Sequence, residues 1–240
     1  MCGRIAIRHS RREIEESFDA RFVDDSNRGP SGSAFVPRFN LAPTEFAPVV
    51  YVSREADSRM KDARIITPMV WGFIPSGEKS SRSVINARCE GIESKPLFRS
   101  EFARQRCLIA ADAFYEWKRS GGVSRPYLIE MNDARPFGIA AIWKDVAGQH
   151  PRCCVLTTSA NDLVSEIHDR MPVIILREDY ATWLSPETPL EAVRSLLRPI
   201  PADLMHIFAV SSAVNRSGYD APDCVSPVDT SNDPPQSSLF

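Results

Sequence analysis

The longest apolar run in the chain reads Cys107-Leu108-Ile109-Ala110-Ala111-Asp112-Ala113-Phe114-Tyr115-Glu116-Trp117. We interpret it as β structure, because the Gly121-Gly122 pair that follows is typical of a hairpin turn between two strands. Residues 127–130 and 137–143 are also apolar and β-prone. We expect them to pair onward from the hairpin, so that this region forms the centre of a sheet.

Short helices and further strands are predicted around this run. Residues 5–7 favour a strand. Ser10 and Glu13 form a capping-box pattern, which predicts a helix that begins just after Ser10. Residues 38–44 lie among three prolines, and we expect a rigid extended loop there, because proline cannot donate a ladder hydrogen bond.

No internal repeat and no break in composition divides the chain, and its strands and short helices do not alternate as βαβ units would. We therefore predict one α+β domain around a mixed, mostly antiparallel sheet that is closed or nearly closed. The domain should span residues 1–225. Residues 226–240 should form a flexible tail, because the sequence from residue 217 onward holds four aspartates and no basic side chain.

The overall composition is that of an ordinary soluble protein, with 43% hydrophobic residues in 240. No apolar run approaches the roughly 20 residues of a membrane span, and the start lacks the basic-then-apolar order of a secretory signal. We expect a cytoplasmic or nuclear monomer with no membrane partner. The six cysteines include no C-x-x-C spacing and the four histidines do not cluster, so neither a metal site nor a cofactor is expected.

The charge is unevenly distributed along the chain. A net charge of −2 argues against a general nucleic-acid binder, yet residues 1–119 hold 20 basic and 16 acidic side chains, whereas residues 120–240 hold 9 and 15. A local positive groove is therefore compatible with the composition.

The first residues, Met1-Cys2-Gly3-Arg4, could provide a reactive N-terminal aminothiol. Removal of Met1 would expose an α-amine beside the Cys2 thiol, whose unperturbed pKa values lie near roughly 8 and 8.5. Such an aminothiol can condense with an aldehyde to an imine and then close a thiazolidine ring through sulfur. The alternative is an incidental cysteine at the second position.

Two titratable side chains stand out as candidates for proton transfer. Glu116 lies in the apolar run, where burial would raise the pKa of its carboxyl into the range of a neutral-pH acid, although it could instead be paired with a basic residue at the sheet margin. His168 follows a short predicted helix capped by Asn161, and the helix dipole would favour its protonated form. It suits proton exchange with an imine, or it is structural.

Other candidates gain weight only in combination. Asn86 could orient a terminal amine, and Arg4, Arg88 and Arg170 could each bind a phosphate in a forked geometry. Taken singly, arginines are usually surface residues. Trp71 could stack on a base or belong to the core.

Together these residues fall within six motifs that resemble, in order, those of the SOS response-associated peptidase (SRAP) family. The motifs are Met1-Cys2-Gly3-Arg4, Phe39-Asn40-Leu41-Ala42-Pro43-Thr44, Trp71-Gly72-Phe73-Ile74-Pro75, Ile85-Asn86-Ala87-Arg88, Arg106 to Trp117, and Ile167-His168-Asp169-Arg170-Met171-Pro172. The resemblance covers nearly the whole chain.

The resemblance implies a protein that shields abasic sites in single-stranded DNA through a covalent thiazolidine. It assigns Cys2 as the nucleophile, Asn86 as the residue that positions its amine, Glu116 as general acid and base, and His168 as an aid to proton transfer. It also implies lyase-like strand cleavage and removal of whatever precedes Cys2. The implied DNA contacts are of two kinds: Arg4, Arg88 and Arg170 would hold flanking phosphates. Trp71, together with Asn40 and Pro43, would form a wedge that separates the DNA bases.

The chain departs from the family pattern in a few places. The polar residues 76–83 replace a stretch that often contains tryptophan, which affects the expected DNA-wedging surface.

An N-terminal-nucleophile glutamine amidohydrolase also begins Cys-Gly, but its oxyanion hole usually includes an Asn-Gly pair, which this sequence lacks. A non-catalytic reader of damaged or modified DNA is the third alternative.

Overall fold

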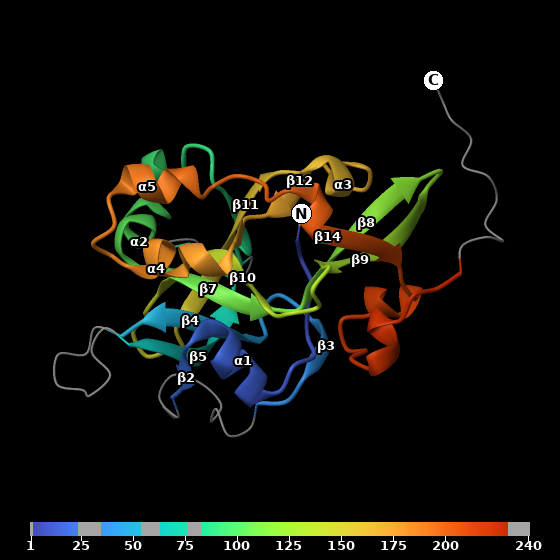
Figure 1. Ribbon diagram of the computed structural model, residues 1–240, viewed down its shortest axis with the longest axis horizontal. Coiled ribbons are helices and arrows are strands. Elements are labelled where there is room, and N and C mark those ends of the chain that lie inside the picture. The colour runs from blue at the N-terminus through green and yellow to red at the C-terminus, as the bar shows by residue number, and fades with distance from the viewer. Residues whose placement is uncertain (1, 24–34, 54–62, 76–82, 230–240) are drawn as a thin grey trace.

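The apolar run is divided between two strands of two different sheets (Figure 1). The computed structural model describes residues 2–23, 35–53, 63–75 and 83–229. In it, β7 (Arg106–Ala111) belongs to the larger sheet and β8 (Ala113–Ser120) to the smaller one. The buried Asp112 separates them, and its carboxylate accepts a hydrogen bond from the backbone N–H of His9 at 3.0 Å. The run therefore joins the two sheets through one anchored residue.

The larger sheet closes into a barrel. Its strands are β2 (Arg21–Phe22), β4 (Phe46–Val52), β5 (Arg64–Trp71), β6 (Asn86–Arg88), β7, β10 (Phe137–Lys144), β11 (Arg152–Ser159), β12 (Arg170–Pro172) and β13 (Ile174–Ile175). The path β11-β10-β7-β4-β5 is antiparallel, and β5 also pairs with β11 in parallel, which completes the ring. The prediction of a mixed, closed or nearly closed sheet is confirmed.

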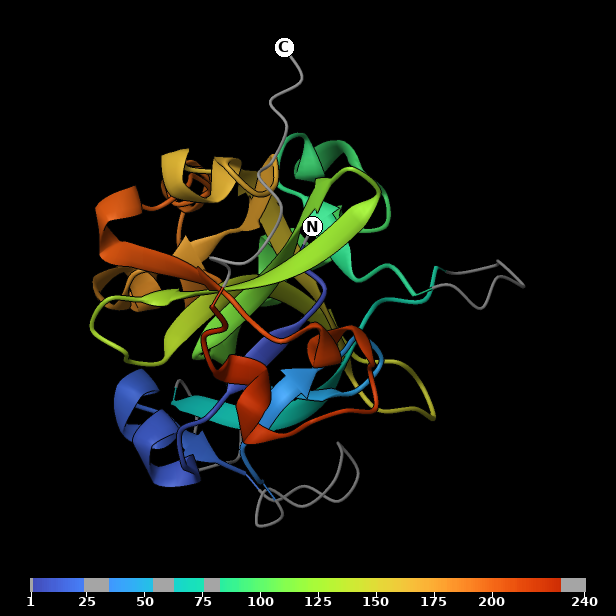
Figure 2. The same ribbon diagram turned by 90° about the vertical axis from the view of Figure 1, so that its right-hand side faces the viewer.

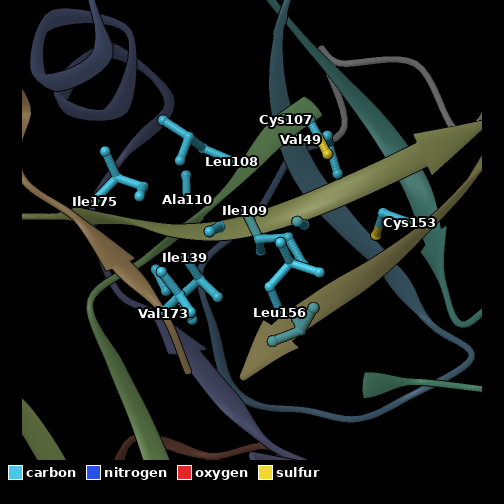
Figure 3. Close-up of a cluster of buried hydrophobic side chains, with 14 of the residues drawn as sticks. Val49, Cys107, Leu108, Ile109, Ala110, Ile139, Cys153, Leu156, Val173 and Ile175 are labelled. Carbon is cyan, nitrogen blue, oxygen red and sulfur yellow. The ribbon is translucent and has the colours of Figure 1, made fainter. Parts of the chain in front are cut away.

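The barrel interior is filled by aliphatic side chains from facing strands (Figure 3). Ile109 and Ile139, which pair across β7 and β10, lie on one side of the strands, whereas Leu108 and Ala110 lie on the other. This alternation follows from the two-residue period of a strand. Residues on both sides are almost fully buried, because helices cover the barrel from outside.

The smaller sheet has the order β14-β9-β8-β1-β3. It consists of β1 (Ile5–Ile7), β3 (Arg38–Leu41), β8, β9 (Val123–Met131) and β14 (Met205–Ala209). The β8–β9 hairpin turns at Gly121 and Gly122, whose φ values of 57° and 82° suit glycine, and the predicted turn is confirmed.

The helices are short. They are α1 (Arg11–Phe18), α2 (Arg99–Arg104), α3 (Asp162–Ser165), α4 (Tyr180–Leu184) and α5 (Leu190–Ser195). The predicted capping box is confirmed, because Ser10 and Glu13 exchange side-chain and backbone hydrogen bonds at the start of α1. None of the described helices is long and apolar enough to cross a membrane.

The expected loop at residues 38–44 is wrong in part, because residues 38–41 form strand β3. This strand pairs with β1 at the edge of the smaller sheet, where a flanking proline does not interrupt a second ladder. Its outer side is covered by residues 211–229, which we call the C-terminal strap. Figure 2 shows the strap in red in front of β3. Asp220 accepts hydrogen bonds there from the backbone N–H groups of Phe39 and Asn40, at 2.6 and 2.9 Å.

The chain forms the predicted single α+β domain, with antiparallel sheets and few helices. The strap remains bonded to the domain slightly beyond the predicted boundary at residue 225, since the Val228 N–H donates to the Ala209 carbonyl at 2.9 Å. Residues 230–240, which make up most of the predicted tail, and residues 76–82 lie outside the described residues.

Candidate functional site

An open cleft of about 630 Å³ lies where three parts of the chain meet. The β8–β9 hairpin, the turn after α3 and the strap form its walls. The lining residues are Glu116, Trp117, Arg119, Ser124, Ile167, His168, Asp169 and Asn215. A hollow of about 750 Å³ at the end of α1 is larger, but it is lined by none of the predicted site residues. The cleft is therefore the candidate site.

Cys2 is fully buried and does not itself line this cleft. The Asn86 side-chain N–H₂ donates to the Cys2 carbonyl at 2.8 Å. Asn86 Oδ1 is buried and accepts no hydrogen bond from the described residues. Asn86 therefore binds the backbone carbonyl of Cys2, and its Oδ1 remains available to accept a further hydrogen bond. Strand β6 brings it there by pairing with β11.

Glu116 supplies a titratable carboxyl at neutral pH. Its residue is only 1% exposed, and desolvation raises the pKa of the carboxyl to about 7. The thiol pKa of Cys2 is raised as well, first by burial and then by the negative charge of Glu116. The two groups are therefore close enough to influence each other, as the sequence-based assignment requires.

His168 faces the same cleft, but the expected effect of the helix dipole on it is wrong. Helix α3 ends at Ser165, and burial lowers the pKa of His168 instead of raising it. The backbone N–H of Arg170 donates to His168 Nδ1 at 2.9 Å. Asp169 Oδ1 lies 3.0 Å from the same nitrogen, so Nδ1 can accept from the Arg170 N–H in the neutral ring or donate to Asp169 in the protonated ring.

Arg4 and Asn40 are engaged inside the protein. Arg4 Nη1 donates to Asn40 Oδ1 at 2.7 Å and to the Val214 carbonyl at 2.9 Å. Asn40 is 0% exposed, and its amide donates to carbonyls of the strap, including that of Tyr219 at 2.7 Å. The direct DNA contacts implied for these two residues do not fit their positions, because both groups are used to hold the strap.

Trp71 belongs to the core. It is 0% exposed, and its indole N–H donates to the Ile85 carbonyl at 3.0 Å. A stacking role for Trp71 does not fit this position, since no face of the ring reaches solvent. Pro43 is half-buried in the turn between β3 and β4 and does not line the cleft. Its implied part in separating DNA bases stays a prediction.

The two remaining arginines differ in availability. Arg88 is exposed on β6, two residues after Asn86 and so on the same side of the strand. Arg170 is paired with Glu90 through two hydrogen bonds of 2.6 and 2.8 Å, and its side chain is 12% exposed. No ion pair with Arg88 occurs within the part of the chain that the structure describes, so its guanidinium can meet a phosphate, whereas Arg170 would first have to leave Glu90.

Sequence reasoning missed six lining residues: Trp117, Arg119, Ser124, Ile167, Asp169 and Asn215. Trp117, Ile167 and Asp169 are chain neighbours of predicted residues, and this proximity was the available signal. Asn215 lies 98 positions from Trp117 in sequence, yet its Oδ1 accepts the indole N–H of Trp117 at 2.6 Å. Among the described residues, no group of three His, Cys, Asp or Glu side chains is placed to hold a metal ion.

Relatives with descriptive names cover nearly the whole chain. Residues 1–217 match the family model described as SOS response associated peptidase (SRAP). The chain is 33% identical to "Abasic site processing protein YoqW" of Bacillus subtilis, over 94% of this chain and 99% of that one. It is 27% identical to "Abasic site processing protein HMCES" of Gallus gallus, over 95% and 78% of the two chains.

Solved structures share the fold. A crystal structure of a protein from Bacteroides thetaiotaomicron superposes with a TM-score of 0.74 at 21% identity, covering 93% of this chain and 99% of that one. A protein from Bordetella bronchiseptica gives 0.70 at 26% identity, with 88% and 100% covered. With a family model that matches almost from end to end and a relative of one-third identity, the chain belongs to the SRAP family.

Proposed function

We propose that this protein processes abasic sites in single-stranded DNA by capturing them covalently through Cys2 after removal of Met1. The names of the relatives support abasic-site processing. The chemistry of the cleft supports the covalent route, and one observation carries it: Glu116, a buried carboxyl whose pKa is about 7, lines an open cleft and lies near enough to Cys2 to raise the pKa of its thiol.

The reaction needs no cofactor. The ring-opened sugar of an abasic site offers an aldehyde, and the Cys2 α-amine adds to it and expels water to form an imine. The thiol then adds across the C=N bond, with sulfur binding carbon and a proton reaching nitrogen, which closes the thiazolidine. Each step moves a proton, so a group that both gives and takes one near pH 7 is needed.

Glu116 fits this need. With a pKa of about 7, its carboxyl is present in both protonation states at neutral pH. The acid form can donate to the sugar ring oxygen and to the departing hydroxyl, and the carboxylate can accept the proton of the Cys2 thiol. The raised thiol pKa makes that second role important, because little thiolate forms without a base.

Asn86 and His168 complete the assignment. The hydrogen bond from Asn86 to the Cys2 carbonyl holds the nucleophile in place, and Oδ1 can accept from the liberated amine. The imidazole of His168, which lines the cleft, can assist proton transfer at the imine or during reversal. An imine also permits β-elimination of the neighbouring phosphate, so lyase-like strand cleavage is a side reaction of this scheme. Autopeptidase activity would correspond to the removal of whatever precedes Cys2.

The test is covalent capture of a single-stranded oligonucleotide that carries one abasic aldehyde. We expect a denaturation-resistant adduct with the mature protein, seen by intact mass, and none with the undamaged strand. Cys2→Ser keeps the amine but replaces the thiol, so it should give only a reversible imine that borohydride traps. Cys107→Ala removes a barrel cysteine as the control. A stable adduct on Cys2→Ala equal to that of the wild type would refute the mechanism.

The same samples discriminate the other two functions. A glutamine amidohydrolase would release ammonia from glutamine, and this activity would be lost in Cys2→Ala. A non-covalent reader would bind damaged strand reversibly with salt and equally well after Cys2→Ala.

A further inference from the structure

We infer that Asp169 is a positioning residue for His168: its carboxylate pairs with the protonated imidazole and so keeps a second proton donor in the cleft that Glu116 also lines. This inference rests on the proposed function, because it assigns a role within the same capture reaction. Asp169 and His168 both line the cleft, and Asp169 Oδ1 lies 3.0 Å from His168 Nδ1.

The backbone fixes this pair at the edge of the cleft. The His168 N–H donates to the Val164 carbonyl in α3 at 2.9 Å, and the Ala160 N–H donates to the Asp169 carbonyl at 3.0 Å. The next residue, Arg170, begins β12, which pairs with β11. The turn between α3 and β12 is therefore held from both sides, so the pairing of Asp169 with His168 orders little more than two side chains.

Nδ1 of His168 has a different partner in each charge state. In the neutral ring it can accept the Arg170 N–H, which lies at 2.9 Å. In the protonated ring both nitrogens carry hydrogen, so Nδ1 can only donate, and Asp169 offers an acceptor within reach. Proton uptake by His168 therefore exchanges one partner of Nδ1 for another.

The charges around His168 act in opposite directions. Burial lowers the pKa of its ring, and the positive charges of the chain's α-amine and of Arg119 lower it further, whereas the charge of Asp169 raises it. Asp169 also raises the pKa of Glu116, the other acid among the residues that line the cleft. Without the charge of Asp169, the pKa of both groups should fall.

The protonated ring has a use in the capture reaction. After the Cys2 amine has added to the aldehyde, the carbinol hydroxyl must take a proton to leave as water, while the nitrogen lone pair forms the C=N bond. Protonated His168 can supply that proton and become neutral. Because Asp169 favours the charged ring, more of this donor is present at neutral pH, and the Glu116 carboxylate remains available to the thiol.

The pairing is tested without DNA by NMR titration of the four histidines in the mature protein, with the His168 signal assigned by its loss in His168→Gln. Asp169→Asn should move the midpoint of the His168 titration to lower pH, and Asp169→Glu, which keeps the charge, should restore part of the shift. Glu166→Gln is the matched control, because Glu166 is exposed two residues before His168 and does not line the cleft. An unchanged midpoint in Asp169→Asn, or an equal shift in Glu166→Gln, would overturn the pairing.

The role in capture is tested by the pH dependence of adduct formation with the abasic strand. The rate of Asp169→Asn relative to the wild type should be close to one at about pH 5 and fall roughly two- to five-fold by about pH 8, as expected for the loss of a partly exposed ion pair. In a His168→Gln background the same substitution should leave the relative rate nearly independent of pH, because no ring remains to be charged. A flat relative rate in Asp169→Asn, or an equal fall in the His168→Gln background, would contradict a role through His168.

These readouts separate the two proposals. A wild-type protein that forms no adduct, but whose His168 midpoint moves in Asp169→Asn and not in Glu166→Gln, would reject the covalent function and keep the pairing. A Cys2-dependent adduct, together with an unchanged midpoint and a flat relative rate in Asp169→Asn, would keep the covalent function and reject the role of Asp169.

Discussion

Glu116→Gln offers a test of the buried carboxyl that is independent of any DNA substrate. The folded protein raises the pKa of Glu116 from 4.5 to about 7, because burial disfavours the charged form. Glutamine has nearly the same shape but cannot ionise. The variant should therefore lose one specific contribution to the pH dependence of stability and retain the others.

The sign and size follow from proton linkage. Between pH 4.5 and about 7 the folded protein keeps the Glu116 proton and the unfolded chain releases it. The free energy of unfolding contributed by this group therefore falls as the pH rises, by about 1.4 kcal/mol per pH unit. The total fall is about 3 kcal/mol over this interval, and the contribution is constant above it.

The assay is urea unfolding of the wild type and Glu116→Gln at matched pH values from about 4.5 to 8.5. The stability of the wild type relative to the variant should decrease by about 3 kcal/mol up to pH 7 and then level off. Glu93→Gln is the control: its pKa is lowered by hydrogen bonds from Arg194, so its stabilising effect is lost only as the pH falls through that lowered value. A flat difference between wild type and Glu116→Gln would refute the raised pKa.

Three further substitutions test the positions of single side chains. Asn86→Ala removes the 2.8 Å hydrogen bond to the Cys2 carbonyl and should slow adduct formation by roughly 10- to 100-fold, measured by quenched-flow intact mass; an unchanged rate would remove Asn86 from the mechanism. Arg88→Ala should weaken binding to single-stranded DNA and reduce its salt slope by about 0.7, and an unaltered slope would exclude a phosphate contact. Asn40→Ala should lower the free energy of unfolding by about 2–4 kcal/mol in urea, because it leaves the Arg4 guanidinium and carbonyls of the strap without partners. A loss below about 1 kcal/mol would mean that water replaces those bonds.

Local signals predicted several elements well. The capping box at Ser10 and the glycine pair after β8 depend on backbone conformations that a few adjacent residues decide, and both appear as expected. The loop expected at residues 38–44 was wrong for residues 38–41, because a proline restricts only the hydrogen bonding of its own position. It could not show that this segment would lie at the edge of a sheet, where one side is covered by a strap that arrives from the end of the chain.

The candidate site also shows which properties local sequence signals can predict and which depend on tertiary contacts. Glu116 could be singled out because a carboxyl in an apolar run has few environments open to it. Trp71 could not be separated from a stacking residue, since a buried and an exposed tryptophan look identical in sequence. Arg4 and Arg170 were equally ambiguous, because an arginine binds a protein carbonyl or carboxylate with the same geometry as a phosphate.

The order of residues alone was sufficient for the family and the α+β class, because these depend on residue type and on spacing along the chain. Only the folded chain could decide which cations remain free, which tryptophan faces the cleft and where the strap runs. Those properties depend on contacts between distant segments, such as Trp117 with Asn215 and Arg4 with Val214, and burial there sets both the availability of a side chain and its pKa.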